Sequence, residues 1–497
     1  LFANFKPYHA TNHTQNRYLQ AEKNRDWMNI KHYEIEIEKE NPFANCKLDR
    51  QKYSSVLTNI INSYPYGFVL ALNNKWGTGK TTFVKMWEQE LKNNGFQTLY
   101  FNAWENDFEN NPLTALMGEL KTLTTEDTKP EFKKTLKRAS TLTKHIAPII
   151  AKAIADRYID TEGIKEAIVG VTEGLSDVFE NEVHEYEKKK KNISEFRESL
   201  GEFIANTNQG KPLIFIIDEL DRCRPNYAVS ILEQIKHFFS VPNIVYILSI
   251  DKEQLGNAIK GVYGSDDINA DEYLRRFIDL EYSIPEPEVD VFYKYLYDYF
   301  EFDAFFQLPE RIKSYELKSD KSNFLETCKL LFTNANVPLR QQEKIFAHSR
   351  LALRSFTTNM YVTPHIFLML SFIKVRHNKF YEELKSKQLS IKELQEYFLS
   401  IIKIDINRDT ERQLMWLEIA LINVYNNYST DRYHRKSLFE RDKTTGENRA
   451  LISSIIKEDS ENDVMAILES INRGHREGDL DLMHYTKRID LLEDMKT

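Results

Sequence analysis

Hydrophobic residues before position 286 gather in short runs, and amphipathic stretches separate these runs. The run 67–72 (GFVLAL) is bounded by glycine and by two asparagines, as is typical of a buried strand. In the stretch 81–93 (TTFVKMWEQELKN), apolar residues recur at the spacing of a helix. Four further runs fit buried strands: 97–104, 212–220, 243–250 and 277–285. Strands that alternate with helices predict an α/β fold, with a parallel sheet covered by helices on both faces.

The pattern changes twice along the chain. Residues 125–200 are rich in charge and carry amphipathic helical patterns, which predicts a helical insertion with a solvated charged face, nucleic-acid contact being the less favoured interpretation. After Pro285 the strand patterns fade, and aromatic and leucine residues recur at helical spacing. We therefore expect a tail or tag remnant at 1–27, an α/β core at 28–124 and 201–285, the insertion at 125–200, a helical lid at 286–375 and an all-α C-terminal domain at 376–497.

Composition narrows the class of protein. The net charge of −8 argues against broad electrostatic binding to nucleic acid, so a nucleic-acid partner stays uncertain. Three cysteines lie far apart without a paired spacing, which favours a reducing compartment and argues against a disulfide framework or a zinc site. No apolar run reaches the roughly 18 residues of a membrane span, and no secretory pattern is visible. We expect a cytoplasmic protein without a membrane span.

A glycine-rich loop follows the first expected strand. Residues 73–82 (NNKWGTGKTT) resemble the phosphate-binding pattern G-x-x-x-x-G-K-[ST], except that Asn74 stands at the first glycine position. That position often adopts a positive φ, which asparagine tolerates better than most residues, so we expect a functional loop. A turn with a chance Gly-Lys-Thr is disfavoured because the loop lies between a strand and a helix. The candidate nucleotide-binding residues are Asn74, Lys75, Trp76, Gly77, Thr78, Gly79, Lys80, Thr81 and Thr82.

The parts of this loop have distinct chemical roles in the prediction. Gly77 and Gly79 leave room for backbone N–H groups to approach phosphate oxygens. Lys80 would place its charge on the β- and γ-phosphates of ATP, and Thr81 would offer its hydroxyl to Mg²⁺. The N-terminus of the following helix would point at the phosphates.

A second motif ends the expected strand at 212–220. An apolar run that ends in Asp-Glu (LIFIIDELDR) is typical of the strand that presents a magnesium-holding aspartate. Asp218 would hold Mg²⁺ through water or together with the Thr81 hydroxyl, and Glu219 would act as general base toward the attacking water. The alternative is a strand end with solvent-facing acids.

Other polar residues near strand ends have two interpretations each. In YFNAWEND, packing at the strand end is the simpler one for Asn102 and Trp104, and a place for Asn102 or Glu105 near the γ-phosphate is the functional one. After the Asp-Glu pair, we expect Asp221 and Arg222 to form a local ion pair, with a direct catalytic role as the alternative.

Four segments together, NPFANCKLDR, NKWGTGKTT, FNAW and FIIDELDRC, are similar to the KAP family of P-loop NTPases over residues 41–350. The resemblance implies a P-loop fold of the additional-strand catalytic-glutamate class, with ATP and Mg²⁺ as ligands. Many members carry transmembrane helices between the two nucleotide motifs, but the insertion at 125–200 is too polar to span a bilayer, which implies a soluble member. Asn74 and Glu219 depart from the commonest family residues, which are Gly and often Asp.

Likeness to the wider oligomeric ATPases adds further candidates. YLRRFIDLEYSIPEPE is similar to their segment before the last strand, where an arginine reaches a neighbouring subunit's γ-phosphate; Arg275 and Arg276 would hold this role. VPLRQQEKIF resembles the start of a helical lid, which implies a phosphate-sensing role for Arg340. Ser249 or Asp251 would sense the γ-phosphate. Surface charge is the alternative interpretation of the three arginines.

These features favour a Mg²⁺-dependent ATPase that works as an oligomeric switch. Bacterial KAP proteins resemble components of antiviral and plasmid-exclusion systems, so we expect phage defence together with a separate protein effector. Two alternatives stay open: a nucleotide-binding scaffold that hydrolyses little and organises an effector, and, less favoured, a nucleic-acid motor. No guanine-reading Asn-Lys-x-Asp signature is present, which favours ATP over GTP.

Overall fold

The structure is a computed structural model of the chain, and it describes residues 35–109, 111–145, 175–207, 210–264, 267–335, 337–402, 408–430, 436–441, 447–457, 460–473 and 478–492. The expected tail at 1–27 lies outside these ranges. The chain divides into two compact units, one formed by Glu34–Pro287 and the other containing Glu288–Thr497.

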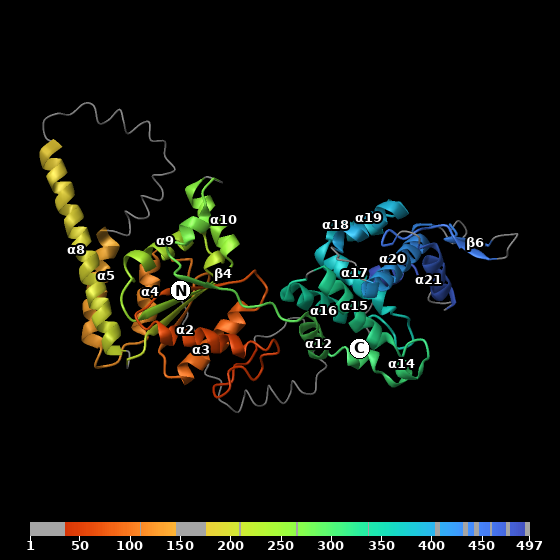
Figure 1. The fold of residues 1–497 in the computed structure, drawn as a ribbon, viewed down its shortest axis with the longest axis horizontal. Helices are drawn as coiled ribbons and strands as arrows, with labels where there is room; N and C mark the ends of the chain where they lie inside the picture. The colour runs from red at the N-terminus through yellow and green to blue at the C-terminus, as the bar shows by residue number, and fades with distance from the viewer. Residues whose placement is uncertain are drawn as a thin grey trace, which may run out of the picture. The chain divides into compact units, whose positions relative to one another are not determined.

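Five parallel strands form the sheet of the first unit, in the order β2-β3-β4-β1-β5. Figure 1 shows this sheet with β4 labelled. Their bounds are β1 Val69–Asn73, β2 Thr98–Asn102, β3 Leu213–Asp218, β4 Ile244–Ile250 and β5 Leu280–Tyr282. Every residue of β3 and β4 is buried, as expected of central parallel strands that are covered on both faces. The predicted α/β fold with a parallel sheet is confirmed.

Helices cover both faces of this sheet. Because successive strand residues point to opposite sides, a buried strand can contribute side chains to two cores. The helices are α2 Gln51–Ser63, α3 Lys80–Asn93, α4 Pro112–Lys121, η1 Leu220–Arg222 (a 3-10 turn), α9 Pro225–His237, α10 Lys252–Tyr263 and α11 Ala270–Leu274. Phe215 and Ile217 of β3 belong to the core shared with α4, α9 and α10, whereas Ile214 and Ile216 belong to the core shared with α2 and α3.

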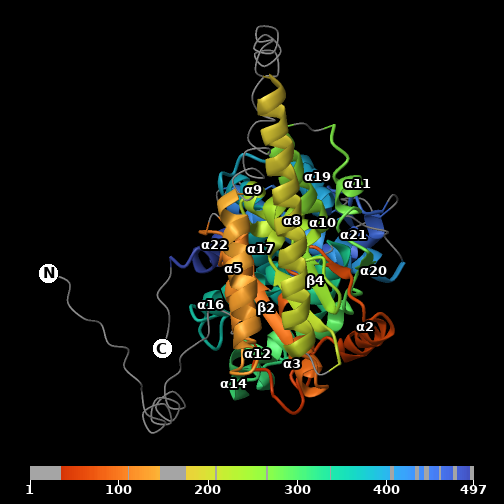
Figure 2. The same cartoon turned by 90° about the vertical axis from the view of Figure 1, so that its left-hand side faces the viewer.

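The described part of the insertion consists of two helices, α5 (Lys129–His145) and α8 (Leu175–Thr207), which run side by side (Figure 2). The ring centroids of Phe132 and Phe203 lie 5.2 Å apart between them. Both rings belong to the hydrophobic core beside the sheet, so these helices are anchored on the α/β core. Residues 146–174 of the insertion lie outside the described residues.

Helices make up most of the second unit. They are α12 Val289–Tyr299, α13 Asp303–Phe306, α14 Pro309–Lys313, α15 Asp320–Asn334, α16 Leu339–Leu353, α17 Pro364–Arg376, α18 Asn378–Lys385, α19 Ile391–Ile401, α20 Arg408–Ser429, α21 Glu461–Arg473 and α22 Leu482–Ile489. One hydrophobic core extends from Tyr293 to Ile489. The stretches expected as a lid and as a C-terminal domain therefore share a core, with the buried α17 as a central helix.

A short antiparallel pair departs from the all-helical expectation for this region. It consists of β6 (Phe439–Arg441) and β7 (Asn448–Ala450). Strands of three residues are too short to show the apolar–polar alternation by which a strand is recognised in a sequence.

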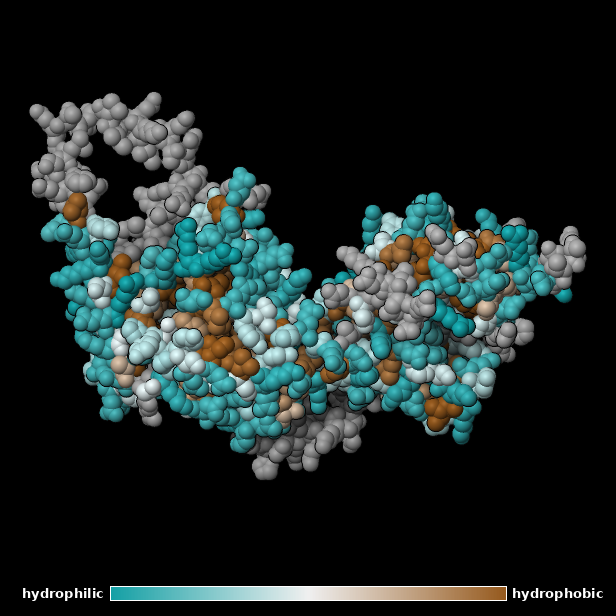
Figure 3. Space-filling view, viewed as in Figure 1, coloured by the Kyte–Doolittle hydropathy of each residue, from teal (hydrophilic) through white to brown (hydrophobic). Residues whose placement is uncertain are grey.

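No described helix is both long enough and apolar enough to pass through a bilayer. On the face shown in Figure 3, hydrophilic residues surround the apolar patches of both units.

Cys46, Cys223 and Cys328 are free thiols.

Candidate functional site

The glycine-rich loop leaves β1 after Asn73 and enters α3 at Lys80, at the carboxyl end of the strand. Gly77 and Gly79 each have a φ of 79°, in the left-handed region that glycine adopts without steric penalty. The first turn of a helix has N–H groups without intrahelical partners, so the start of α3 offers donors to an anion. The loop therefore has the strand–loop–helix context that the phosphate-binding prediction requires.

Asn74 does not play the expected conformational role. It is not among the described non-glycine residues with a positive φ, so the expectation that it replaces glycine by tolerating that conformation is wrong. Its N–H donates to the carbonyl oxygen of Ile250 (3.1 Å), which extends the pairing of β1 with β4. Its side-chain amide donates to the Ile284 carbonyl (2.7 Å) and accepts from the Ile284 N–H (2.9 Å). Asn74 thus ties the start of the loop to the chain beyond β5.

An arginine without an expected role supports the loop. Arg50 precedes α2, is 3 % exposed, and donates to the carbonyl oxygens of Thr78 (2.7 Å) and Gly79 (3.1 Å). In a trans peptide the C=O group and the N–H group that follows it point in opposite directions. The N–H groups that follow the two bonded carbonyls are those of Gly79 and Lys80, and they therefore point away from Arg50. Burial lowers the pKa of Arg50, and within the described residues it has no carboxylate partner. Its place at the end of the NPFANCKLDR motif was the available sequence signal.

The ammonium of Lys80 lies inside the curve of the loop. It donates to the carbonyl oxygens of Asn74 and of Lys75, the latter at 3.3 Å. Burial lowers the pKa of Lys80, and nearby carboxylates oppose this shift. These carboxylates belong to Asp221, Asp251 and Asp218. The loop cation therefore faces the acids that end β3 and β4.

Asp218 is the last residue of β3 and is 1 % exposed. One carboxylate oxygen accepts a hydrogen bond from the Tyr100 hydroxyl (2.9 Å), and the other accepts one from the N–H of Glu219 (2.9 Å). Its neighbour in β4 is Ser249, whose buried hydroxyl has no hydrogen-bond partner among the described residues. Because buried polar groups are normally paired, we expect a polar group from outside the chain to complete this position.

Glu219 has a left-handed backbone conformation, with φ 60°. Such conformations are uncommon for residues other than glycine and cluster at functional sites. One carboxylate oxygen pairs with the Arg222 guanidinium (2.5 Å), and the other accepts from the Asn102 amide (3.3 Å). Burial raises the pKa of Glu219, and Arg222 opposes the shift. Both oxygens of the expected base are engaged in this conformation.

The expected ion pair between Asp221 and Arg222, both of which the structure describes, does not form. Arg222 pairs with Glu219 instead. Asp221 accepts a hydrogen bond from the indole N–H of Trp76, and the backbone N–H of Trp76 donates to Asp251 (3.1 Å). Burial raises the pKa of Asp221, and the bond from Trp76 opposes this shift. The loop tryptophan therefore connects the loop to two acids, a pairing that no sequence pattern indicates.

Asn102 closes the strand end, as the simpler interpretation expected, and its place near the γ-phosphate stays a prediction. Its side-chain oxygen accepts from the N–H groups of Trp104 (3.1 Å) and Glu105 (3.3 Å), which closes the turn after β2. Its amide donates to Glu219. Trp104 and Glu105 are exposed, and the Arg222 guanidinium lies 5.8 Å from the centre of the Trp104 ring. A role for Glu105 near a phosphate stays a prediction.

The two candidate finger arginines lie near the amino-terminal ends of the strands, whereas the loop lies at their carboxyl-terminal ends. Arg275 and Arg276 are exposed and precede β5. Near these amino-terminal ends Asp279 joins the start of β1, since its carboxylate accepts from the Val69 N–H (2.8 Å) and its N–H donates to the Val69 carbonyl (3.0 Å). Arg275 lies 3.5 Å from a Glu272 oxygen. Their finger role stays a prediction.

The candidate phosphate sensors lie in different units. Ser249 and Asp251 are at the carboxyl end of β4, where Asp251 also caps α10 by accepting from the Gln254 N–H (3.4 Å). Arg340 belongs to the second unit, exposed in the first turn of α16. The structure therefore gathers Ser249 and Asp251 with Lys80 and Asp218, and the role of Arg340 stays a prediction.

Comparison with known proteins identifies relatives. The model of the KAP family P-loop domain matches residues 50–407. The chain is 31% identical over 175 residues to the uncharacterized protein MJ0182 of Methanocaldococcus jannaschii, a match that covers 31% of this chain and 89% of that protein. It is 20% identical over 266 residues to the phage T7 exclusion protein of Escherichia coli (strain K12), covering 48% of this chain and 34% of that protein.

Two solved structures are similar at low scores. The Aeropyrum pernix ORC2 protein (ADPNP-ADP complexes) is 12% identical, with a TM-score of 0.31 and coverage of 85% of this chain and 94% of that one. A DNA replication initiation factor is 12% identical, with a TM-score of 0.26 and coverage of 94% and 98%. The family model, by contrast, begins at the loop-supporting Arg50, spans both nucleotide motifs and ends in the helical unit, and the chain accordingly belongs to the KAP family of P-loop domains.

Proposed function

We propose that the chain is a Mg²⁺-dependent ATPase that works as an oligomeric switch. One observation carries the proposal: the Lys80 ammonium lies beside the glycine loop and among the acids that end β3 and β4. Ligands of open parallel sheets bind at this edge, outside the carboxyl ends of the strands.

The residues of the site would act on defined atoms. The N–H groups of Gly79 and Lys80, with the Lys80 ammonium, would hold the phosphate oxygens. When bound, Mg–ATP supplies the phosphoryl group that is transferred. Glu219 would take the proton of the attacking water, and its raised pKa makes it a stronger base than an exposed glutamate.

The proposed magnesium ligands fit the chemistry of the ion. Mg²⁺ prefers oxygen ligands and keeps several waters when it binds beside phosphates. The Thr81 hydroxyl in the first turn of α3 and the Asp218 carboxylate offer such oxygens. The described residues contain no group of three or more His, Cys, Asp or Glu that could hold a metal. An ion held mainly by phosphates and water, and assisted by Thr81 and Asp218, is compatible with this.

The engaged state of Glu219 favours a second candidate function, a nucleotide-binding scaffold that hydrolyses little. Arg222 and Asn102 occupy the two carboxylate oxygens of Glu219. A base held in this way must be released before it can activate water. The switch requires this release, whereas the scaffold does not.

The oligomeric part of the proposal rests on Arg275 and Arg276. Because both lie near the amino-terminal ends of the strands, opposite the loop, a finger role requires that a second subunit present its phosphates. Arg340 would sense the phosphates of its own chain. The likeness to the phage T7 exclusion protein supports an anti-phage context. A separate protein effector and a cytoplasmic location complete the proposal. The net charge of −8 makes a nucleic-acid motor the weaker alternative.

Lys80→Ala tests the nucleotide site. The variant loses the cation aimed at the phosphates and should show no binding of Mg–ATP in isothermal titration calorimetry. Lys92→Ala is the matched control, because Lys92 is an exposed lysine in the last turn of α3, at the end of the helix remote from the loop, and should be dispensable for affinity. Wild-type affinity in folded Lys80→Ala protein would contradict the assignment.

Glu219→Gln separates the two candidate functions. Loss of a general base typically reduces the rate by about 10²–10⁴-fold, so phosphate release should fall by this factor while ATP binding persists. The exposed Glu253 of α10 provides the matched control, Glu253→Gln, which should hydrolyse ATP normally. A wild-type protein that binds ATP without measurable turnover would instead favour the scaffold.

A further inference from the structure

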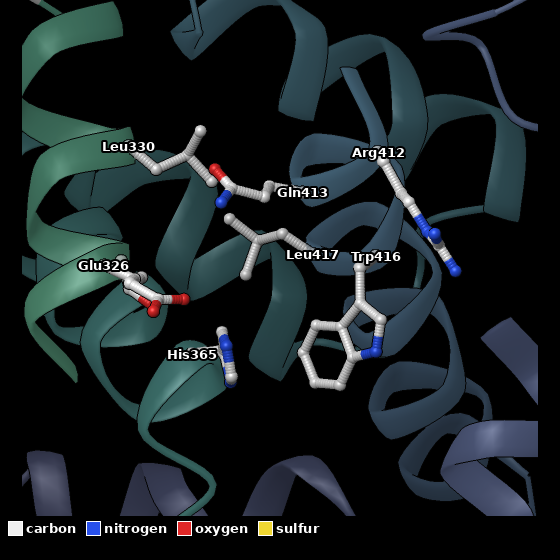
Figure 4. A pocket seen from close by; sticks show the side chains of 8 residues that line it. Glu326, Leu330, His365, Arg412, Gln413, Trp416 and Leu417 are labelled. Carbon is white, nitrogen blue, oxygen red and sulfur yellow. The ribbon is translucent and has the colours of Figure 1, made fainter. Parts of the chain in front are cut away.

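A hollow of about 480 Å³ lies in the second unit, between α15, α17 and α20. Its volume falls within the range of small-molecule sites. Figure 4 shows Leu330 and Leu417 on its walls, together with the Trp416 ring. Apolar walls that include a flat indole favour a ligand with a planar ring.

His365 adds a polar edge to this wall. Its ring centroid lies 4.4 Å from that of Trp416, with 45° between the ring planes. Burial lowers the pKa of His365 to about 4, so the imidazole is neutral at pH 7 and offers one N–H donor and one lone pair.

The backbone that carries His365 is strained. Thr363 caps α17 with φ 43° and ψ 73°, in the left-handed region that a β-branched residue rarely adopts. Pro364 follows as the first residue of α17, so the strained cap sets the direction in which the first turn, with His365, begins. Strained residues persist where their surroundings hold them in place, and they cluster at ligand sites.

The charged groups around the hollow are arranged asymmetrically. In Figure 4 the Glu326 carboxylate and the Gln413 amide point toward the hollow from opposite sides, whereas the Arg412 guanidinium points away from it. Arg412 also lines the hollow, but because its guanidinium points away, the carboxylate is the labelled charge that faces the interior. A carboxylate repels anions and accepts hydrogen bonds from N–H groups. Phosphate is therefore the wrong chemistry for this hollow.

We propose that this hollow binds an uncharged, planar heteroaromatic ligand of about nucleoside size. Its ring lies against the wall of Trp416 and His365, Glu326 accepts its N–H groups, and the Gln413 amide offers both a donor and an acceptor to its edge. All four residues belong to the second unit, so the proposal does not depend on the glycine loop.

Nucleosides are suitable probes because they lack phosphate. Adenosine, guanosine, cytidine and uridine are titrated into the full chain carrying Lys80→Ala, with saturation-transfer NMR and calorimetry as readouts. At least one should bind, and Glu326→Gln and Gln413→Ala should each weaken it at least about tenfold. Both side chains are exposed at the rim, so these variants leave the core intact. Glu396→Gln and Gln388→Ala, at exposed positions of the same unit, are the matched controls and should bind normally.

Trp416→Leu provides a second readout, because it keeps an apolar side chain and removes the flat ring; binding should be lost. Three results would overturn the proposal: no nucleoside binds, the rim variants bind as well as their controls, or binding disappears on going from the wild-type chain to Lys80→Ala. If Trp416→Leu fails to fold, the binding of nucleosides to Glu326→Gln and Gln413→Ala still tests the proposal.

Discussion

Each unit contains an arginine that is at most 3 % exposed, and the charges of these two residues are compensated differently. Arg311 in the second unit is 0% exposed, pairs with Asp320, and donates to the carbonyl oxygens of Thr358 (2.8 Å) and Met360 (3.0 Å). Arg50 in the first unit is 3 % exposed and donates to two loop carbonyl oxygens, without a carboxylate partner among the described residues.

The difference indicates what each charge does. A buried charge is costly unless it is paired and hydrogen-bonded. The charge of Arg311 is neutralised within the fold, so we expect this residue to govern stability. The charge of Arg50 is not neutralised by the described residues and lies behind a loop whose N–H groups suit an anion, so we expect this residue to govern nucleotide affinity.

Arg311→Met should have the largest effect. It leaves the buried Asp320 carboxylate without its cation, which typically costs about 3–5 kcal/mol of unfolding free energy. Urea denaturation measures this loss, and Asp320→Asn in the same background should recover part of it. ATP affinity of the folded protein should not change. A parallel loss of affinity would remove the contrast between the two arginines.

Arg50→Met should weaken Mg–ATP binding by about 10–100-fold, since hydrogen bonds to charged groups are worth about 1.5–3 kcal/mol. Arg50→Lys should be intermediate, because an ammonium keeps the charge but lacks the fork that holds two carbonyls. Calorimetry and the ATP-induced shift of the melting temperature measure the effect. If Arg50→Met lowers the urea midpoint but binds ATP like the wild type, the residue only stabilises the fold.

Glu418→Gln should have the smallest effect and tests a third kind of compensation. Glu418 is 0% exposed and accepts hydrogen bonds from Gln395 (2.6 Å), the Ile455 N–H (3.1 Å) and Ser454. Burial raises its pKa above the ordinary value of 4.5. Its contribution to stability is therefore fully present below pH 4.5 and is lost as pH rises through the folded-state pKa.

Glu418→Gln does not titrate, so the variant does not lose this contribution to stability as the pH rises. It should be more stable than the wild type at pH 8, by at most about 1 kcal/mol, the scale of a buried hydrogen bond. Melting temperatures from pH 4 to 8 test the sign. A wild type that is more stable than the variant at pH 8 would show that the ionised form is the better compensated one.

The central strands β3 and β4 could be predicted from the sequence because they are buried on both faces and therefore appear as continuous apolar runs. The edge strand β5 has only exposed and half-buried residues, and it could be placed because it lies inside the longer run 277–285. All five strands lie within or overlap such runs. The pair β6–β7 could not, because three residues show no periodicity.

The loop and the Asp-Glu pair could be predicted because their chemistry requires fixed residue types at fixed spacing. Contacts made by tertiary packing carry no such signal. Arg50 donates a hydrogen bond to Thr78, which is 28 positions away in the sequence, and Trp76 donates one to Asp221, which is 145 positions away. Asn74 was placed in the loop for an incorrect reason, because a side-chain contact with a residue 210 positions away cannot be recognised locally.

The contact between Asn74 and Ile284 has a mechanical consequence. Ile284 lies three residues before Pro287, where the first unit ends. The two hydrogen bonds therefore link the loop to the segment from Ile284 to Pro287, through which the chain leaves the first unit. If the loop moves, either both bonds break or this segment moves with it. A glycine at position 74 would bring the loop closer to the general pattern but would remove both hydrogen bonds.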